Sequence, residues 1–169
     1  MEVKIKRLSE NAVIPKYSLE GDGAQDLVAT SKNYDEFGNI HYGTGLAFSI
    51  PEGYVGLLFP RSSNAKKDLI LSNSVGVLDS NYRGEVSFKF KPSAVLYSDI
   101  PNPENNIGTI SETFDDVILP NSLVPFQEYS IGDRIGQIII LPYPKIEFIE
   151  VDELGETNRG EGGYGSTGK

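Results

Sequence analysis

Short runs of apolar residues, separated by frequent glycines and prolines, limit the fold of this chain more than any other feature. Its 169 residues include 18 Gly and 10 Pro, and the runs between them have strand length and many β-branched or aromatic side chains. This pattern predicts one all-β domain, a sandwich or a barrel, with enough residues for its own core. The predicted strands are residues 3–8, 26–30, 45–50, 54–59, 86–90, 134–141 and 145–151, with one or two helical turns around 62–67.

The composition argues against several classes of function. The net charge is −9, and binders of nucleic acid usually depend on basic patches. There is no Cys, and His41 is the only His, so a catalytic triad or an imidazole zinc site would have to use it. We interpret His41 as a surface or edge-strand residue. No apolar run approaches the ~20 residues that span a bilayer, and the N-terminus alternates like a strand rather than a signal peptide. We expect a cytoplasmic protein that binds neither nucleic acid nor membrane.

Two regions differ from the rest of the chain. Residues 92–133 have no Lys or Arg, seven carboxylates and five prolines, and we interpret 92–131 approximately as a surface insertion that includes a strand at 116–119. The alternative is a module that binds a partner protein. The tail, residues 158–169, has five Gly and cannot contribute to a core, so we expect it to be flexible until a ligand orders it.

Five segments carry residues suited to a nucleotide and its phosphates. They are DGAQDL (22–27), PRSS (60–63), GVLDSNYRGE (76–85), GDRIGQ (132–137) and RGEGGYGSTG (159–168). In this order they resemble the trimeric dUTPase family. The resemblance implies a jelly-roll-like β-barrel or sandwich, with one β domain at 1–157 and a tail at 158–169 that closes over the nucleotide. It also implies a homotrimer with shared active sites and Mg²⁺-assisted hydrolysis of dUTP to dUMP and pyrophosphate.

The hairpin at 76–85 is the part that the resemblance assigns to base, sugar and water. On the residues alone, Asp79 is a turn residue that caps the backbone, whereas the family implies that it orders and deprotonates the attacking water. The family holds uracil through hairpin backbone groups that include Gly76, and Asn73 is expected to add a side-chain amide. The ring of Tyr82 is expected to lie against the deoxyribose and to leave no partner for a 2′-hydroxyl. Arg83 is expected to pair with Glu85 or with a neighbouring subunit.

The remaining segments are assigned to phosphate and metal by the same resemblance. Guanidinium and hydroxyl donors suit phosphate oxygens, and the expected donors are Arg61, Ser62, Gln137 and Arg159. Asp26 is expected to hold Mg²⁺ through water, because Mg²⁺ keeps its waters and is carried mainly by substrate phosphates. Ser63 is also expected to contact the substrate, and it stands where the family usually has Gly. The expected contacts from the tail are Tyr164, Gly165 and Ser166, and the ring of Tyr164 is expected to stack on uracil. Arg134 serves either the site or a subunit interface.

Two alternatives share this scaffold. The first is a dCTP deaminase or a bifunctional relative, although that family lacks the hairpin and the tail seen here. The second is a dUTPase scaffold that acts as a regulatory protein through residues 92–133. Insertions at this place resemble those of some phage members of the family.

Overall fold

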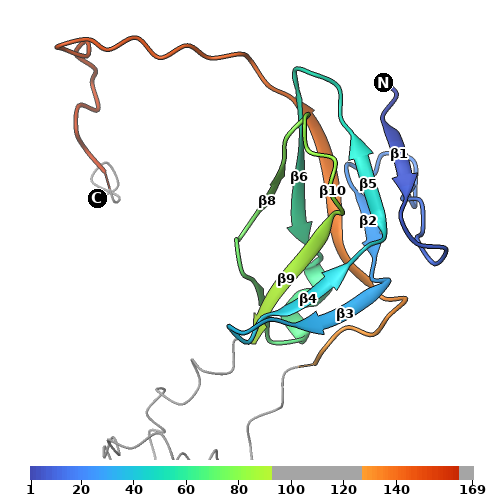
Figure 1. The fold of residues 1–169 in the computed structure, drawn as a ribbon. Coiled ribbons are helices and arrows are strands. Elements are labelled where there is room, and N and C mark those ends of the chain that lie inside the picture. Colours follow the sequence, from blue (N-terminus) through green and yellow to red (C-terminus); the bar gives the residue numbers. More distant parts are fainter. Residues whose placement is uncertain (93–126, 164–169) are drawn as a thin grey trace, which may run out of the picture.

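The computed structural model describes residues 1–92 and 127–163, and within them the chain is an all-β fold with one short 3₁₀ helix (Figure 1). The predicted all-β class is confirmed, and so is the helical turn, which is η1. The predicted strand at 116–119 lies outside the described residues. The elements are β1 Lys4–Arg7, β2 Gln25–Val28, β3 Ser31–Tyr34, β4 Ile40–Gly43, β5 Leu46–Ser49, β6 Tyr54–Pro60, η1 Ser62–Lys66, β7 Leu69–Leu71, β8 Gly76–Leu78, β9 Ser87–Pro92 and β10 Arg134–Pro142.

The strands form two four-stranded sheets and one two-stranded pair, all antiparallel. One sheet has the order β2-β10-β6-β8, the other has the order β3-β4-β9-β7, and β1 pairs with β5. The long strands β6 and β10 pair along seven positions at the centre of the first sheet. The site residues of four motifs therefore lie on or next to a single sheet.

The core fills the space between the two sheets. In β9 the aromatic side chains of Phe88 and Phe90 point inward while Lys89 and Lys91 point outward, as a half-buried strand requires. The sheets approach closely at β10, where a Cβ on Gly136 would lie 2.2 Å from Cε1 of Phe88. Gly136 is therefore required by packing rather than by backbone conformation.

The sequence analysis did not predict four of the strands, and the reasons differ between them. The sequence of β3 is SKNY and all four residues are exposed, so β3 is defined by its pairing with β4 and not by an apolar face. The strands β7 and β8 are only three residues long. The fourth, β4, carries His41 and lies between β3 and β9. The prediction of a surface or edge-strand position for His41 is therefore wrong, because His41 is half-buried in an interior strand.

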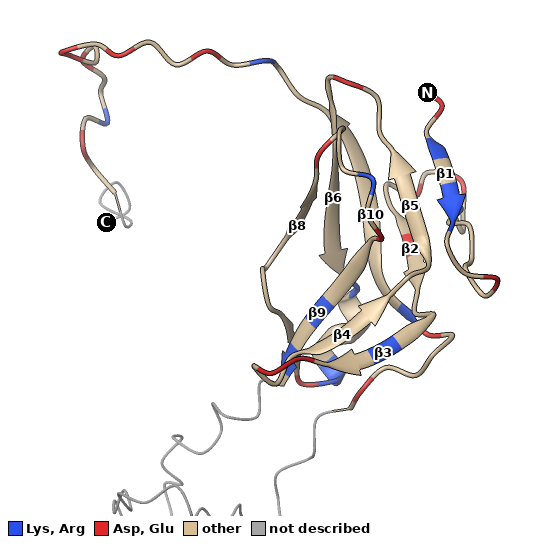
Figure 2. Ribbon diagram, in the orientation of Figure 1, with Lys and Arg blue, Asp and Glu red and all other residues tan. Residues whose placement is uncertain are grey.

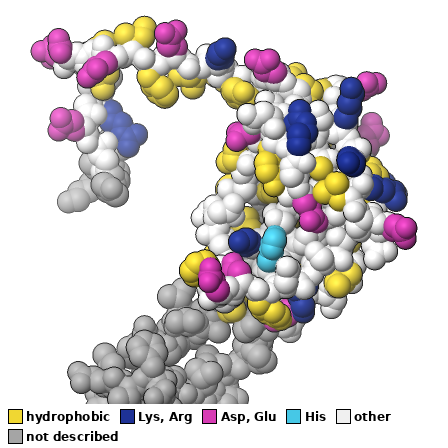
Figure 3. All heavy atoms as spheres, in the orientation of Figure 1, with side chains coloured by type: hydrophobic (Ala, Val, Ile, Leu, Met, Phe, Trp, Pro, Cys, Tyr) yellow, Lys and Arg dark blue, Asp and Glu magenta, His cyan; other side chains and the backbone are white. Residues whose placement is uncertain are grey.

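The chain leaves the body after β10 as an extended arm, residues 143–157 (Figure 1). The predicted strand at 145–151 is wrong for the described part of the chain, where these residues pair with no strand. Their apolar side chains face solvent, and Phe148 is 92% exposed. Figure 3 shows these apolar side chains along the arm, and Figure 2 shows that its charges are mostly acidic. Among the described residues, no helix combines the length and the apolar character needed to cross a bilayer.

Candidate active site

The predicted β-hairpin at 76–85 is wrong as a strand pairing, because β8 pairs with β6 whereas β9 pairs with β4 and β7 in the other sheet. The segment, still called the hairpin below, is a turn that links the two sheets.

The hairpin after β8 is held mainly by its own backbone. The backbone N–H of Tyr82 donates to the carbonyl of Asp79 over 3.1 Å, which closes the turn. The guanidinium of Arg83 donates from Nη1 to the carbonyls of Ser80 at 2.6 Å and Tyr82 at 2.9 Å. The expected pair of Arg83 with Glu85 is therefore wrong within the chain. Instead Arg83 caps carbonyls that would otherwise compete for ligand donors.

The ring of Tyr82 folds back over Gly84. Its hydroxyl donates to the carbonyl of Glu85 over 3.1 Å, and a Cβ on Gly84 would lie 2.4 Å from that hydroxyl oxygen. Glu85 itself is anchored, because its Oε1 accepts the backbone N–H of Gly45 over 2.7 Å. Both ends of the hairpin are thus fixed, one in β8 and the other at the turn between β4 and β5.

A pocket of about 220 Å³ opens beside this hairpin. Its lining includes Asn73, Gly76, Asp79 and Tyr82, four residues that the sequence predicts to contact base, sugar or water. The remaining wall combines apolar residues, among them Leu58 and Leu78, with the polar residues Glu85 and Ser87. Asp79 also borders a larger hollow of about 450 Å³ that contains none of the other predicted residues. The smaller pocket therefore brings together the residues that the sequence predicts for base and sugar, whereas the larger hollow does not.

A second group of predicted residues lies on β2, β10 and the turn after β6. Gln137 of β10 is the cross-strand partner of Asp26 in β2 and of Phe59 in β6. These three side chains therefore lie on the same face of the sheet. The side-chain amide of Gln137 donates to the carbonyl of Pro60 over 3.3 Å. The three motifs that supply them are far apart in sequence, and the sheet brings them together.

Asp26 bridges two arginines in this group. Its Oδ1 accepts from Nε of Arg61 at 2.7 Å, and its Oδ2 accepts from Nη1 of Arg134 at 3.1 Å. The side chains of Asp26 and Arg61 are only 20% and 25% exposed, whereas that of Arg134 is 54% exposed. Solvent therefore weakens the pair with Arg134 more than the pair with Arg61.

Ser63 is accommodated in η1 without strain. The non-glycine residues with positive φ in the described chain are Asp68 and Ser74, so Ser63 has ordinary backbone geometry. Its Oγ accepts Nη1 of Arg61 at 3.3 Å. The neighbouring Ser62 is exposed at the start of η1.

The two groups lie at opposite ends of β6. Leu78 is paired with Gly56, so Asp79 follows at the level of Val55, six residues before Arg61. At ~3.3 Å per residue this separation is about 20 Å. The Asp79 carboxylate and the Arg61 guanidinium of one chain are therefore too far apart to contact the same atom.

The described residues hold no preformed metal cage. No group of three or more His, Asp or Glu side chains with metal-binding geometry occurs in residues 1–92 and 127–163. The carboxylate of Asp26 is already neutralised by two arginines, which suits an indirect, water-mediated contact to a cation better than direct ligation.

The described part of the tail, residues 158–163, does not join either group. Arg159 is exposed on the arm and its Nε donates to the carbonyl of Gly162 over 2.8 Å. Tyr164, Gly165 and Ser166 lie outside the described residues.

A family model described as dUTPase matches residues 10–94. The deoxyuridine 5'-triphosphate nucleotidohydrolase of Finegoldia magna is 36% identical to the chain, with 99% of each sequence covered. The chain belongs to the dUTPase family. A second relative of the same description, from Corynebacterium glutamicum, is also 36% identical and covers 99% of the chain and 95% of its own length.

Solved dUTPase structures match the fold described above. The Staphylococcus bacteriophage 80alpha dUTPase with dUPNHPP superposes with a TM-score of 0.73 at 25% identity, covering 99% of both chains. A phage phi11 dUTPase from S. aureus, described with a structural Mg(II) ion, superposes with a TM-score of 0.64 at 25% identity. The predicted dUTPase-type sandwich is therefore confirmed. The roles of individual residues stay predictions and are proposed below.

The shifted pKa values of this dUTPase-family chain lie mostly away from both groups, except that Tyr129 contacts η1 beside the second group. Hydrogen bonds from Asn39 lower the pKa of Asp35 to about 2. The hydrogen bond from Lys32 lowers the pKa of Glu128, and burial raises the pKa of Tyr129. These groups surround β3 and the segment before β10, and the sequence analysis singled out none of them. The sequence signal that could have pointed to Glu128 and Tyr129 is their position just before the GDRIGQ motif, and Asp35 has no such signal.

Proposed function

We propose that the chain is a homotrimeric dUTPase that hydrolyses dUTP to dUMP and pyrophosphate. The observation that carries the proposal is the pocket beside the hairpin, where Asn73, Gly76, Asp79 and Tyr82 meet. These residues match a pyrimidine edge, a deoxyribose face and a base for water. The reaction breaks the bond between the α-phosphorus and its bridging oxygen as water attacks the phosphorus, and pyrophosphate leaves.

The hairpin supplies the groups for specificity and for the water proton. Asp79 is exposed on the rim of the pocket, where its carboxylate can orient a water and take its proton. The ring of Tyr82, held by Glu85 and accommodated by Gly84, forms a wall that excludes a 2′-hydroxyl. Asn73 and the backbone at Gly76 supply complementary polar groups for the uracil edge.

The ionic group supplies donors for the triphosphate. Arg61 neutralises charge on the phosphates, and Ser62 and Gln137 donate hydrogen bonds to their oxygens, as the leaving group departs. Arg159 of the tail completes the donors, and Tyr164, Gly165 and Ser166 cover the base and phosphates. When bound, Mg²⁺ neutralises phosphate charge and aids the leaving pyrophosphate, with Asp26 holding it through water.

Shared sites between subunits follow from the length of β6. Asp79 and Arg61 of one chain are about 20 Å apart along that strand, whereas both must act on one α-phosphate. A trimer supplies the hairpin and the phosphate donors from different chains, and closed C₃ symmetry repeats the site three times. The exposed arm supports the same assembly, since Phe148 and Leu154 gain by burial on a neighbour.

Substrate turnover tests the proposal directly. The purified chain with Mg²⁺ is expected to release pyrophosphate from dUTP far faster than from dCTP, dTTP or UTP. Turnover of UTP at a comparable rate would contradict the role of Tyr82. Release of ammonia from dCTP would instead support the deaminase alternative.

Mixed trimers test the shared site. Arg61→Gln and Asp79→Asn are each expected to be inactive, and equal co-refolding should restore roughly a quarter of the sites, because hairpin and donors come from different chains. Verified mixed trimers without any recovered activity would argue that each chain carries a complete site.

A partner protein at residues 92–131 stays a prediction, as does a cytoplasmic location. Residues 93–126 lie outside the described part of the chain. One observation favours a regulatory role: the matched phage 80alpha dUTPase is described as controlling transfer of virulence genes. Replacing residues 93–125 with a Gly-Ser linker should leave dUTP hydrolysis intact and remove any such binding, whereas a folded but inactive trimer would place this region in the active site.

A further inference from the structure

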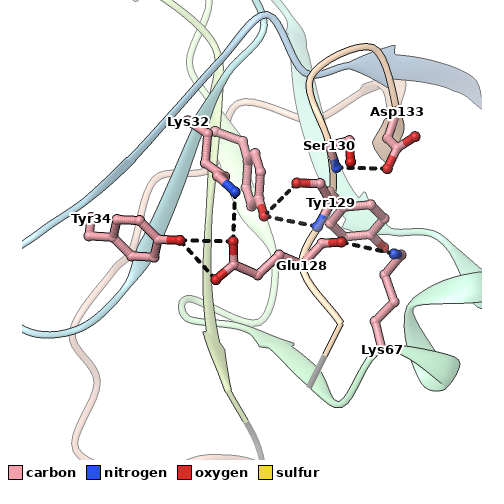
Figure 4. Close-up of polar contacts among 8 residues, drawn as sticks. Lys32, Tyr34, Lys67, Glu128, Tyr129, Ser130 and Asp133 are labelled. Atoms are coloured by element: carbon pink, nitrogen blue, oxygen red, sulfur yellow. Dashed lines mark hydrogen bonds and ion pairs between the residues drawn. The ribbon is translucent and has the colours of Figure 1, made fainter. Parts of the chain in front are cut away.

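The segment between residue 127 and β10 is bonded to three separate elements (Figure 4). The carboxylate of Glu128 accepts Nζ of Lys32 at 2.6 Å and the hydroxyl of Tyr34 at 2.8 Å, both from β3. Its carbonyl accepts Nζ of Lys67, which lies 4.6 Å from the centre of the Tyr129 ring. This segment therefore ties β3 to the end of η1.

Tyr129 is the buried centre of this network. It is 2% exposed, and the hydroxyl of Tyr42 both accepts its backbone N–H at 3.0 Å and donates to its carbonyl at 3.2 Å. The side chain of Tyr42 thus replaces a neighbouring strand for the backbone of Tyr129. Because the backbone is held in this way, the Tyr129 side chain has a fixed direction into the core.

The hydroxyl of Tyr129 reaches the helical turn that carries the phosphate motif. It donates to Oδ1 of Asn64 at 3.1 Å, and Nδ2 of Asn64 donates to the carbonyl of Leu69 at 2.6 Å. The backbone N–H of Asn64 in turn donates to the carbonyl of Arg61 at 2.9 Å. Asn64 is 8% exposed and is held at both ends of its amide, so it fixes the turn that begins at Arg61.

We propose that Tyr129 is a positioning residue for the phosphate-binding turn, acting through Asn64 on Arg61 and Ser62. The inference rests on the proposed function, because it concerns the same triphosphate site. A buried acceptor that loses its donor is left unsatisfied. Without the Tyr129 hydroxyl, the Asn64 amide rotates or a water molecule binds to it. The turn then no longer holds the Arg61 guanidinium in its orientation.

Tyr129→Phe tests this with the full-length chain, because it removes one hydroxyl and keeps the ring. Tyr34→Phe is the matched control, since it removes a hydroxyl that binds the same segment at Glu128 but not η1. Two ligands are measured by calorimetry: dUTP with an imido group in place of the α,β-bridging oxygen, and deoxyuridine, which has no phosphate.

For Tyr129→Phe we expect about threefold to tenfold weaker binding of the imido analogue, the usual range for one buried hydrogen bond. Deoxyuridine affinity should stay at the wild-type value, and Tyr34→Phe should bind both ligands as wild type. The double variant Tyr129→Phe/Asn64→Ala should bind the analogue no more weakly than Asn64→Ala alone, because the two residues act as a unit.

Three results would overturn the inference. The first is an unchanged affinity of Tyr129→Phe for the imido analogue. The second is an equal loss of affinity for deoxyuridine, which would indicate that the whole site is loosened. The third is an equal loss of analogue affinity in Tyr34→Phe. Failure of the proposed function is distinguishable, because it appears as absent dUTP hydrolysis in the unaltered chain.

Discussion

The hairpin of residues 76–85 and the ionic group around Asp26 are organised in opposite ways. The hairpin is one continuous stretch, and its bonds from Tyr82 to Asp79 and from Arg83 to Ser80 stay within four residues of each other. The ionic group joins Asp26 to Arg134, which is 108 positions away in the sequence. The first is a local structure, and the second exists only because the sheet forms.

This difference determines how each region meets its ligand. The hairpin presents backbone groups and a fixed ring before any nucleotide arrives, so little has to be rearranged on binding. In the ionic group, Asp26 compensates the charge of Arg61 in the free chain, and described contacts use two of the five donors of the guanidinium. In the proposed site, we expect the phosphates to meet a guanidinium that is already oriented and still has donors available.

The largest expected effect concerns the hairpin. Asp79→Asn keeps shape and hydrogen bonding but removes the base, so kcat should fall by roughly 10²–10⁴. Binding of the imido dUTP analogue should be largely kept. Steady-state kinetics and calorimetry measure the two quantities, and a near-normal kcat would exclude Asp79 as the base.

A smaller effect separates the two arginines that bind Asp26. Arg61→Lys keeps the charge but loses the planar fork, and kcat/KM for dUTP should fall by about tenfold to a hundredfold. Arg134→Lys should change kcat/KM by less than about threefold, because the side chain of Arg134 is more than half exposed and solvent weakens its ion pair with Asp26. Equal losses in the two variants would place Arg134 in the phosphate site rather than at its edge.

Gly84→Ala should weaken the choice of sugar. The new methyl meets the hydroxyl of Tyr82 and forces the ring to move, so the ratio of kcat/KM for dUTP over UTP should fall by about tenfold. Gly155→Ala is the control, since a Cβ there meets nothing within 4 Å. An unchanged ratio in Gly84→Ala would show that the observed ring position does not set sugar discrimination.

The smallest effect lies outside both regions, at Asp35. Its pKa of about 2 is below the ordinary value of 3.8, so the ionised form is favoured by folding. This contribution is complete above pH 4 and is lost as the pH falls toward 2. Between pH 4 and pH 2, the melting temperature of Asp35→Asn should therefore fall by less than that of the wild type. An identical acid slope, measured by circular dichroism, would contradict the assignment.

The same contrast explains what could be predicted from sequence. The turn from Asp79 to Tyr82 and the short helical turn after Arg61 depend on neighbours in the chain and were predicted correctly as local structures. The predicted β-hairpin was wrong, because β8 and β9 pair with strands of different sheets. The double ion pair of Asp26 and the contact between Tyr129 and Asn64 require the sheet register, which no local pattern contains. The polar strand β3 was missed because its stability comes from β4 and not from its own side chains.

The apolar arm has a consequence for how stability is measured. Phe148 is 92% and Leu154 is 89% exposed on one chain, and in the proposed trimer a second copy buries them. Folding and association then become one equilibrium, in which dilution itself acts as a denaturant. The melting temperature of this protein should therefore rise with its concentration, and at nanomolar levels the arm should be open to proteolysis.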